Sequence, residues 1–323
     1  MRYSVWACLL TLVALGGCVK PESATSSSEA PERDKAKPVV ALVMKSLANE
    51  FFKTMEDGAR AHQQAHADEY DLVAVGTKDE LDINRQVQLV EQMIAQRVNA
   101  LVIAPADSKA LVGVCKRAQD AGIVVVNIDN RFDADALAER GLKIPFVGPD
   151  NRKGARLAGE YLARHLQPGD PVAIIEGVPT TFNAQQRKLG FEDAMQAAGM
   201  RVVSSQTANW EMDRANQGVA ALITEKPDMK AFRCANDSMA LGAVSALRAA
   251  NRLSNTFVVG FDNISAVQEL LKKGEILATV DQHADQLAVF GIEYALEMLK
   301  TGSTPEDRET PVDLITGETL TAS

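Results

Sequence analysis

Short runs of apolar residues alternate with amphipathic stretches along nearly the whole chain after Pro38. In the amphipathic stretches apolar residues recur every three or four positions, as at Val87, Val90 and Ile94, which is typical of a helix with one buried face. Apolar runs that alternate with helices predict parallel β-strands covered by helices on both faces of a sheet. The predicted strands are Val39–Met44, Leu72–Val75, Ala100–Ala104, Ile123–Ile128, Val172–Ile175, Val202–Ser205, Ala231–Cys234, Phe257–Phe261 and Leu277–Val280.

Nine predicted strands are many for one α/β sheet, so the sequence favours two lobes that divide them. Glycine and proline interrupt the pattern at Val147–Asn151, where we expect a boundary between lobes. Thr279–His283 and Pro311–Ile315 are two further segments where the chain is expected to cross. We therefore predict two Rossmann-like α/β lobes with parallel sheets, a three-stranded hinge and a ligand site in the cleft. The predicted N-terminal lobe comprises residues 38–148 and 283–310, and the C-terminal lobe residues 149–282 and 311–323.

The start of the chain is typical of an export signal. Arg2 precedes an apolar run from Val5 to Leu15, which is too short to span a bilayer comfortably and ends in Leu-Gly-Gly-Cys. This ending resembles a bacterial lipobox, which implies cleavage before Cys18 and acylation of that cysteine; the alternative is an ordinary signal that happens to contain a cysteine. We predict a signal peptide at residues 1–17, and the lipidated cysteine with a flexible Ser- and Glu-rich tether at residues 18–37.

The net charge and the cysteines of the chain limit the classes of protein to which it can belong. The 323-residue chain has a net charge of −9 and no cluster of basic residues, which argues against nucleic-acid binding. Of the four cysteines, Cys8 would leave with the signal and Cys18 would carry lipid. Cys115 and Cys234 could pair in an exported protein, but one lies on a predicted helix and the other in a distant strand. We expect two buried free thiols.

Polar and aromatic side chains recur at the carboxyl ends of the predicted strands, where open α/β sheets bind ligands. Hydrogen-bonding side chains beside flat rings suit a sugar, whose hydroxyls pair with the polar groups while its C–H faces stack on the aromatics. Taken singly, each residue is more typical of a helix cap or a core position. In the best-defined case we expect Asp237 or Ser238 to cap a helix directly after Asn236. The strand-end set is Lys45, Asn49, Phe51, Phe52, Asp129, Asn130, Trp210, Asn236, Asp262 and Gln282.

Arg187 lies on the first turns of a predicted helix, where an arginine is usually solvated unless the helix end faces the cleft. Signs of catalysis are weak. His62 and His66 have a spacing that can bind metal, but no Glu accompanies them as in a His-Glu-x-x-His motif. The sequence contains neither a glycine-rich phosphate loop nor a Gly-x-Ser-x-Gly elbow. We predict no catalytic residue, no metal site and no cofactor.

Several segments together resemble the periplasmic sugar-binding proteins of the ribose/galactose type, which deliver sugars to ABC transporters. The resemblance covers Pro38 to about Leu320. Lys45, the loop Asp133–Ile144, Ile174–Gly177 and Trp210 are closer to the allose-binding branch than to the ribose one. The segments that carry the resemblance are Ser46–Phe52, Ala104–Asp107, Asn127–Asp129, Arg187 with Gly190 and Phe191, Trp210–Arg214, Ala235–Gly242 and Gly260–Asp262.

This resemblance implies a type I periplasmic-binding-protein fold whose lobes close over an aldose such as allose or ribose. Two positions depart from the ribose pattern: Ala104 replaces an asparagine, and Asn130 replaces an arginine, for which Arg131 could substitute. The resemblance assigns sugar binding to Lys45, Asn49, Phe51, Phe52, Asp129, Asn130, Arg187, Trp210, Asn236, Asp262 and Gln282.

The expected protein is a monomeric, non-enzymatic lipoprotein of the periplasm or cell envelope that hands its sugar to the permease of an ABC importer. The alternative is a sensor that presents a sugar or polyol to a chemoreceptor or kinase, because its binding site would look the same. A sugar-responsive repressor would need a basic helix-turn-helix ahead of the core, where this chain has the predicted signal and acidic tether. A sugar-converting enzyme is the weakest alternative, because no paired catalytic groups are evident.

Overall fold

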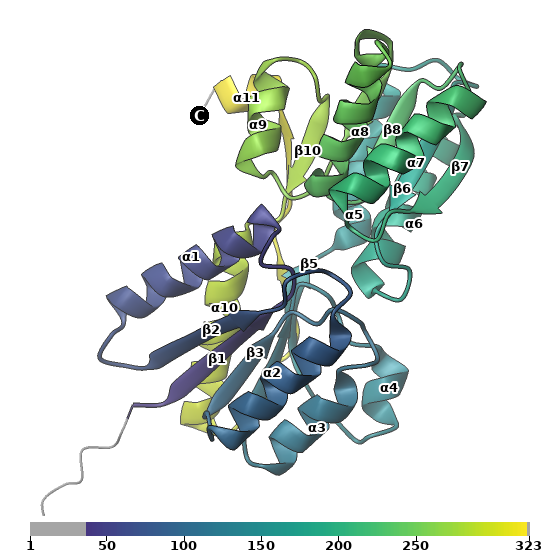
Figure 1. The fold of residues 1–323 in the computed structure, drawn as a ribbon. Coiled ribbons are helices and arrows are strands. Elements are labelled where there is room, and N and C mark those ends of the chain that lie inside the picture. Colours follow the sequence, from purple (N-terminus) through teal and green to yellow (C-terminus); the bar gives the residue numbers. More distant parts are fainter. Residues whose placement is uncertain (1–36, 322–323) are drawn as a thin grey trace, which may run out of the picture. The chain divides into compact units, whose positions relative to one another are not determined.

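Two six-stranded sheets form the framework of residues 37–321, the part of the chain that the computed structural model describes (Figure 1). The first sheet has the order β11-β5-β4-β3-β1-β2 and is parallel throughout. Its strands are β1 (Val39–Met44), β2 (Asp71–Gly76), β3 (Ala100–Ile103), β4 (Val124–Ile128), β5 (Phe146–Pro149) and β11 (Arg308–Thr310). The predicted signal peptide, Cys18 and the tether up to residue 36 lie outside the described residues.

The second sheet has the order β12-β10-β9-β8-β6-β7, with only β12 antiparallel to its neighbour among these strands. Its strands are β6 (Pro171–Glu176), β7 (Arg201–Thr207), β8 (Ala231–Cys234), β9 (Phe257–Val259), β10 (Ala278–Asp281) and β12 (Asp313–Thr316). The predicted fold class, two parallel-sheet α/β lobes, is confirmed.

Helices cover both faces of the first sheet, because its central strands are apolar on both sides. In β1, Leu42 packs in the core beneath one pair of helices and Val43 in the core beneath the other, and both are fully buried. The helices on the Leu42 side are α1 (Glu50–Ala65) and α10 (Ala284–Thr301); those on the other are α2 (Ile83–Ala95) and α3 (Val112–Asp120), with α4 (Ala134–Ala138) beyond.

The second sheet is covered in the same way. Ile174 and Ile175 of β6 are buried under different helix pairs. These are α5 (Asn151–Ala163) with α6 (Phe182–Ala197), and α7 (Met212–Glu225) with α8 (Asp237–Ala249). The remaining elements are η1 (Leu253–Asn255), α9 (Ser265–Lys272) and α11 (Gly317–Thr321).

The chain passes between the two sheets three times. It leaves the first sheet after β5 to form α5, returns between β10 and α10, and crosses again between β11 and β12. These crossings overlap the three segments at which the sequence predicts them. Three strands near these crossings were not predicted by the apolar pattern: β5 and β11 of the first sheet and β12 of the second.

Cys115 and Cys234 are both free and buried, as predicted. Burial raises the pKa of each thiol to about 12, so both stay protonated near neutral pH. None of the helices between residues 37 and 321 combines the length and apolar character that a membrane crossing needs.

Candidate functional site

A cavity between the lobes collects most of the residues that the sequence singles out. About 240 Å³ of space at this site, open solvent included, is not filled by protein atoms. Its lining residues follow the carboxyl ends of strands or begin helices of both lobes. They are Lys45, Asn49, Phe51, Phe52, Glu80, Asp129, Asn183, Arg187, Trp210, Asn236, Asp262 and Gln282. Every predicted site residue except Asn130 is in this set, whereas Glu80 and Asn183 were not predicted.

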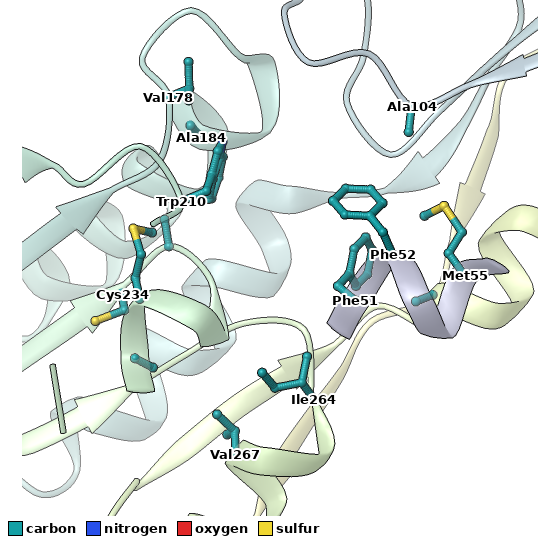
Figure 2. Packing of buried hydrophobic residues seen from close by; sticks show 14 of the residues in the cluster. Phe51, Phe52, Met55, Ala104, Val178, Ala184, Trp210, Cys234, Ile264 and Val267 are labelled. Atoms are coloured by element: carbon teal, nitrogen blue, oxygen red, sulfur yellow. The ribbon is translucent and has the colours of Figure 1, made fainter. Parts of the chain in front are cut away.

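Two phenylalanine rings and one tryptophan ring face each other across the cavity (Figure 2). Phe51 and Phe52 occupy the first turn of α1, with ring centroids 5.1 Å apart at 82°. Asn49 fixes this turn as the N-cap, because its side chain accepts a hydrogen bond from the Phe51 N–H at 3.1 Å. The rings are nearly fully buried, so their faces line the cavity and are not exposed to solvent.

Lys45, Glu80 and Asp129 form a charged group on the N-terminal wall. The Lys45 Nζ atom lies 3.5 Å from Asp129 Oδ2 and 3.8 Å from Glu80 Oε2. Both of these carboxylate oxygens are buried without a hydrogen-bond partner among the described residues. Burial raises the pKa of Glu80 to about 7, and the nearby Lys45 charge opposes only part of that rise.

Arg187 and Asp262 form the centre of the C-terminal wall. The Arg187 Nε atom donates to Asn151 Oδ1 at 2.7 Å, and Nη1 donates to the Ala235 carbonyl at 2.9 Å and to Asp262 Oδ1 at 3.5 Å. Gln282 Nε2 also donates to Asp262 Oδ1, at 2.7 Å. Burial raises the pKa of Asp262 well above its ordinary value against the opposing Arg187 charge, and burial also lowers the pKa of Arg187.

Trp210 is held in an unusual backbone conformation, with φ of +69°. Its ring packs so closely over Gly177 that a Cβ atom there would lie 2.2 Å from the ring. Its indole Nε1 is buried and has no hydrogen-bond partner among residues 37–321. Because Lys45 Nζ and the Arg187 guanidinium each lie within 6 Å of the ring, at 5.7 and 5.6 Å, Trp210 contacts charges from both walls.

The predicted cap of α8 is wrong. Asn236 is itself the N-cap, with Oδ1 accepting from Met239 N–H at 2.9 Å, while its Nδ2 donates to the Trp210 carbonyl. Asp237 instead accepts hydrogen bonds from Thr279 Oγ1 at 2.7 Å and Ile264 N–H at 3.0 Å, which tie α8 to β10 and to the start of α9.

Asn130 does not line the cavity but contacts the other lobe. Its Nδ2 donates to the Pro105 carbonyl, and its Oδ1 accepts from the backbone N–H of Asn183 at 3.3 Å. Ser108 Oγ accepts from the next N–H of the same helix, that of Phe182, at 2.9 Å. The contribution of Asn130 to ligand binding stays a prediction.

A second contact between lobes follows the same plan. Glu50 Oε1, on α1, accepts from the Ser265 N–H at the start of α9 at 2.8 Å. Neither α6 nor α9 has a side-chain cap of its own at the N-cap residue. Side chains of the N-terminal lobe therefore cap two helices of the C-terminal lobe.

Only weak features of the sequence point to the two lining residues that were not predicted. Glu80 follows β2 by four positions in a charged loop, and Asn183 opens the same helix as Arg187. Applied to β2, the strand-end rule would have indicated this loop but would not have distinguished Glu80 from Lys78 and Asp79. The cavity as a whole offers buried hydrogen-bond donors and acceptors between aromatic faces. Among residues 37–321, no group of side chains is arranged to hold a metal ion.

Comparisons with known proteins agree with this geometry. Residues 40–304 match the family model described as a periplasmic binding protein domain. A D-ribose/D-allose-binding protein from Pseudomonas aeruginosa is 59% identical over 315 residues, which cover 95% of this chain and 97% of that protein.

Two solved structures are similar over most of the chain. A solute-binding protein of an ABC transporter from Burkholderia multivorans is 57% identical, with a TM-score of 0.85, covering 87% of this chain and 99% of that one. A periplasmic solute-binding protein from Actinobacillus succinogenes with bound D-allose is 33% identical, with a TM-score of 0.83, covering 89% of this chain and all of the other. The chain belongs to the periplasmic binding protein family.

Proposed function

We propose that the protein captures a neutral monosaccharide, an aldose of the allose or ribose kind, in the cleft between its lobes and delivers it to an ABC importer. The observation that carries the proposal is a buried cavity whose free polar atoms lie between aromatic rings. Glu80 Oε2, Asp129 Oδ2, Trp210 Nε1 and Gln282 Oε1 all line the cavity without a hydrogen-bond partner in the described chain. A polyhydroxylated ring satisfies such atoms while its C–H faces pack on Phe51, Phe52 and Trp210.

The proposed mechanism is lobe closure. A sugar bound to one wall gains the hydrogen bonds of the other wall only when the lobes come together, so it shifts the population toward the closed form. The names of the P. aeruginosa and A. succinogenes relatives support the choice of sugar and of transporter. No conversion of the sugar is proposed: the polar groups are assigned to binding, and the importer is assigned as the receiving partner.

The test is thermal-shift screening of the purified full-length chain with D-allose, D-ribose, myo-inositol and the acid D-gluconate. Binding to the folded state raises the melting temperature by mass action, so D-allose or D-ribose is expected to stabilise the protein and gluconate is not. If none of the neutral sugars changes the melting temperature, the proposal is wrong. Incubation with the bound sugar followed by mass spectrometry should recover it unchanged.

We also propose that the protein acts as a monomer attached to the membrane through lipid on Cys18. In cells, labelled palmitate should enter the wild-type protein, and Cys18→Ser should prevent this and move the protein to the soluble envelope fraction. Cys8→Ser is the matched control and should leave labelling unchanged. An unlabelled wild-type protein would rule out the anchor without affecting the sugar site.

A further inference from the structure

Glu80 lies in the wall between the cavity and a groove that opens outside it. It lines both spaces, and its side chain is only 4% exposed. The outer groove is also lined by Glu211 and Met212, which precede and begin α7 in the other lobe. Glu80 is therefore placed where the end of a bound sugar nearest the cleft mouth would lie.

One oxygen of the Glu80 carboxyl is held and the other is free. Asn49 Nδ2 donates to Oε1 at 3.4 Å, which orients the group. Oε2 is buried without a hydrogen-bond partner in the described chain, and Lys45 Nζ at 3.8 Å is too distant for a hydrogen bond. Leaving a buried carboxylate oxygen unpaired is costly, so its place beside Lys45, which lines the cavity, points to a ligand that supplies the missing donor.

We propose that Glu80 contacts the ligand directly and, with Lys45, selects neutral sugars that present hydroxyls toward the cleft mouth over the corresponding sugar acids. This inference rests on the proposed function and specifies its site. Hydroxyls placed between Lys45 Nζ and Glu80 Oε2 accept from the ammonium and donate to the carboxylate. A hydroxyl can do both at once, whereas a ligand carboxylate can only accept.

The charge balance of the cavity supports this selection. Lys45 and Arg187 face three carboxyl groups, those of Glu80, Asp129 and Asp262. Lys45 lies between two of them, and Arg187 hydrogen-bonds the third. No positive charge lining the cavity is left to neutralise a ligand anion, and a like charge beside Glu80 in this buried space is strongly disfavoured.

The site should also respond to pH. The groups that act on Glu80 from the neighbouring elements are Lys45 after β1, the Asn49 amide, Asp129 after β4 and Glu211 before α7. Burial is the largest influence on this carboxyl, and together with these groups it raises the pKa of Glu80 to about 7. A sugar hydroxyl that donates to Glu80 favours the ionised form, so affinity should fall as pH drops below 7, by at most about tenfold per pH unit.

Isothermal titration calorimetry of the full-length wild type, Glu80→Gln and Glu80→Ala with D-allose and D-allonate tests the inference. At pH 8 we expect D-allose affinity to fall about tenfold in Glu80→Gln and about 100-fold in Glu80→Ala. Wild-type affinity should fall between pH 8 and pH 5.5, while that of Glu80→Gln should stay nearly constant. The preference for D-allose over D-allonate should shrink in both variants.

Glu211→Gln is the matched control, because Glu211 lines the outer groove but not the cavity. At pH 8 it should bind D-allose within about twofold of wild type. Its affinity should still fall at low pH, with the midpoint moved to lower pH because the Glu211 charge helps to raise the pKa of Glu80. Equal affinity and equal pH profiles in wild type and Glu80→Gln, with folding verified by melting temperature, would refute a ligand contact by Glu80. A wild type that binds no sugar refutes the proposed function itself, so the two failures are distinguishable.

Discussion

The two walls of the cavity are built from similar residues but are completed differently. On the C-terminal wall, Arg187 hydrogen-bonds Asn151, the Ala235 carbonyl and Asp262, and Gln282 also donates to Asp262. On the N-terminal wall, carboxylate oxygens of Glu80 and Asp129 lie near Lys45 without a hydrogen bond in the described chain. The charged groups of the C-terminal wall are therefore held by hydrogen bonds before a ligand binds, whereas those of the N-terminal wall depend on the ligand for theirs. Trp210 Nε1 and Gln282 Oε1 are two further cavity atoms without a partner in the described chain.

This difference predicts separate consequences for stability and for binding. A network whose members satisfy one another supports the fold even when no ligand is present. A group of buried charges that lacks hydrogen bonds lowers the stability of the free protein. This loss is offset only when a ligand supplies the missing donors. Substitutions on the two walls should therefore affect binding similarly and stability differently.

The largest expected effect separates Asp262→Ala from Asp129→Ala. Both should weaken sugar binding by about 100-fold or more, because each removes a charged acceptor in the cavity. Asp262→Ala should also lower the free energy of unfolding by about 3–5 kcal/mol, since Arg187 stays buried without its carboxylate. Asp129→Ala should change it by less than about 1 kcal/mol. Urea unfolding of the sugar-free proteins measures both values, and an equal loss in the two variants would contradict the comparison.

Glu80 should make the sugar-free protein less stable as pH rises. The pKa of its carboxyl is about 7 in the folded protein against an ordinary value of 4.5, so the folded state binds more protons than the unfolded state between these pH values. The free energy of unfolding contributed by this group therefore falls from pH 4.5 to pH 7, by at most about 3 kcal/mol. Because burial also raises the pKa of Asp237 to about 7, the informative quantity is the difference between wild type and Glu80→Gln. Parallel stability curves for the two proteins would show that Glu80 titrates normally.

Arg233 is a buried charged residue of the C-terminal lobe that does not line the cavity. It lies between Ile174 and Val259 in the second sheet, and its guanidinium is buried with no hydrogen bond in the described chain. Arg233→Met should raise the free energy of unfolding by about 2 kcal/mol at pH 7 and leave sugar affinity unchanged. Burial lowers the pKa of Arg233 to about 9, so the gain should shrink as pH rises above 9 and the arginine loses its charge. A destabilised Arg233→Met would show that the guanidinium is paired in solution.

The smallest expected effects come from the caps that join the lobes. Ser108→Ala and Glu50→Ala each remove an acceptor that is available only when the lobes are together. Each should weaken sugar binding by about fivefold, since losing a helix cap costs about 1 kcal/mol and here destabilises only the closed form. Ser265→Ala is the control, because the Glu50 bond uses its backbone N–H. The three variants should have the same free energy of unfolding. Unchanged sugar affinity in Ser108→Ala and Glu50→Ala would show that these caps do not favour closure.

The periodic pattern of apolar residues predicts the fold, and with it most of the residues that line the cavity. Buried parallel strands are apolar on both faces, so runs such as Val39–Met44 and Ala231–Cys234 mark β1 and β8 to the residue. Polar residues that directly follow such strands, for example Lys45 and Asp129, come together because the carboxyl ends of parallel strands share one edge of the sheet.

What could not be predicted depends on contacts between distant segments. Glu80 lies in a loop with Lys78 and Asp79, and nothing local distinguishes the buried charge from its neighbours. Asp237 has the chemistry of a helix cap, but Thr279 and Ile264 engage its carboxylate and leave the cap to Asn236. Strands β5 and β11 are short and are added through the hinge, so their own residues carry little apolar pattern.

The path of the chain through the hinge also constrains the order of folding. Helix α10 and strand β11 complete the first sheet, yet they follow the whole of the second sheet up to β10 in the sequence (Figure 1). Leu287 and Ile292 of α10 belong to the core that also contains Val40 and Leu42 of β1. During synthesis from the N-terminus, the early strands must wait for segments roughly 250 residues later before that face is covered, and such distant contacts form slowly. The first lobe to begin is thus among the last to be finished.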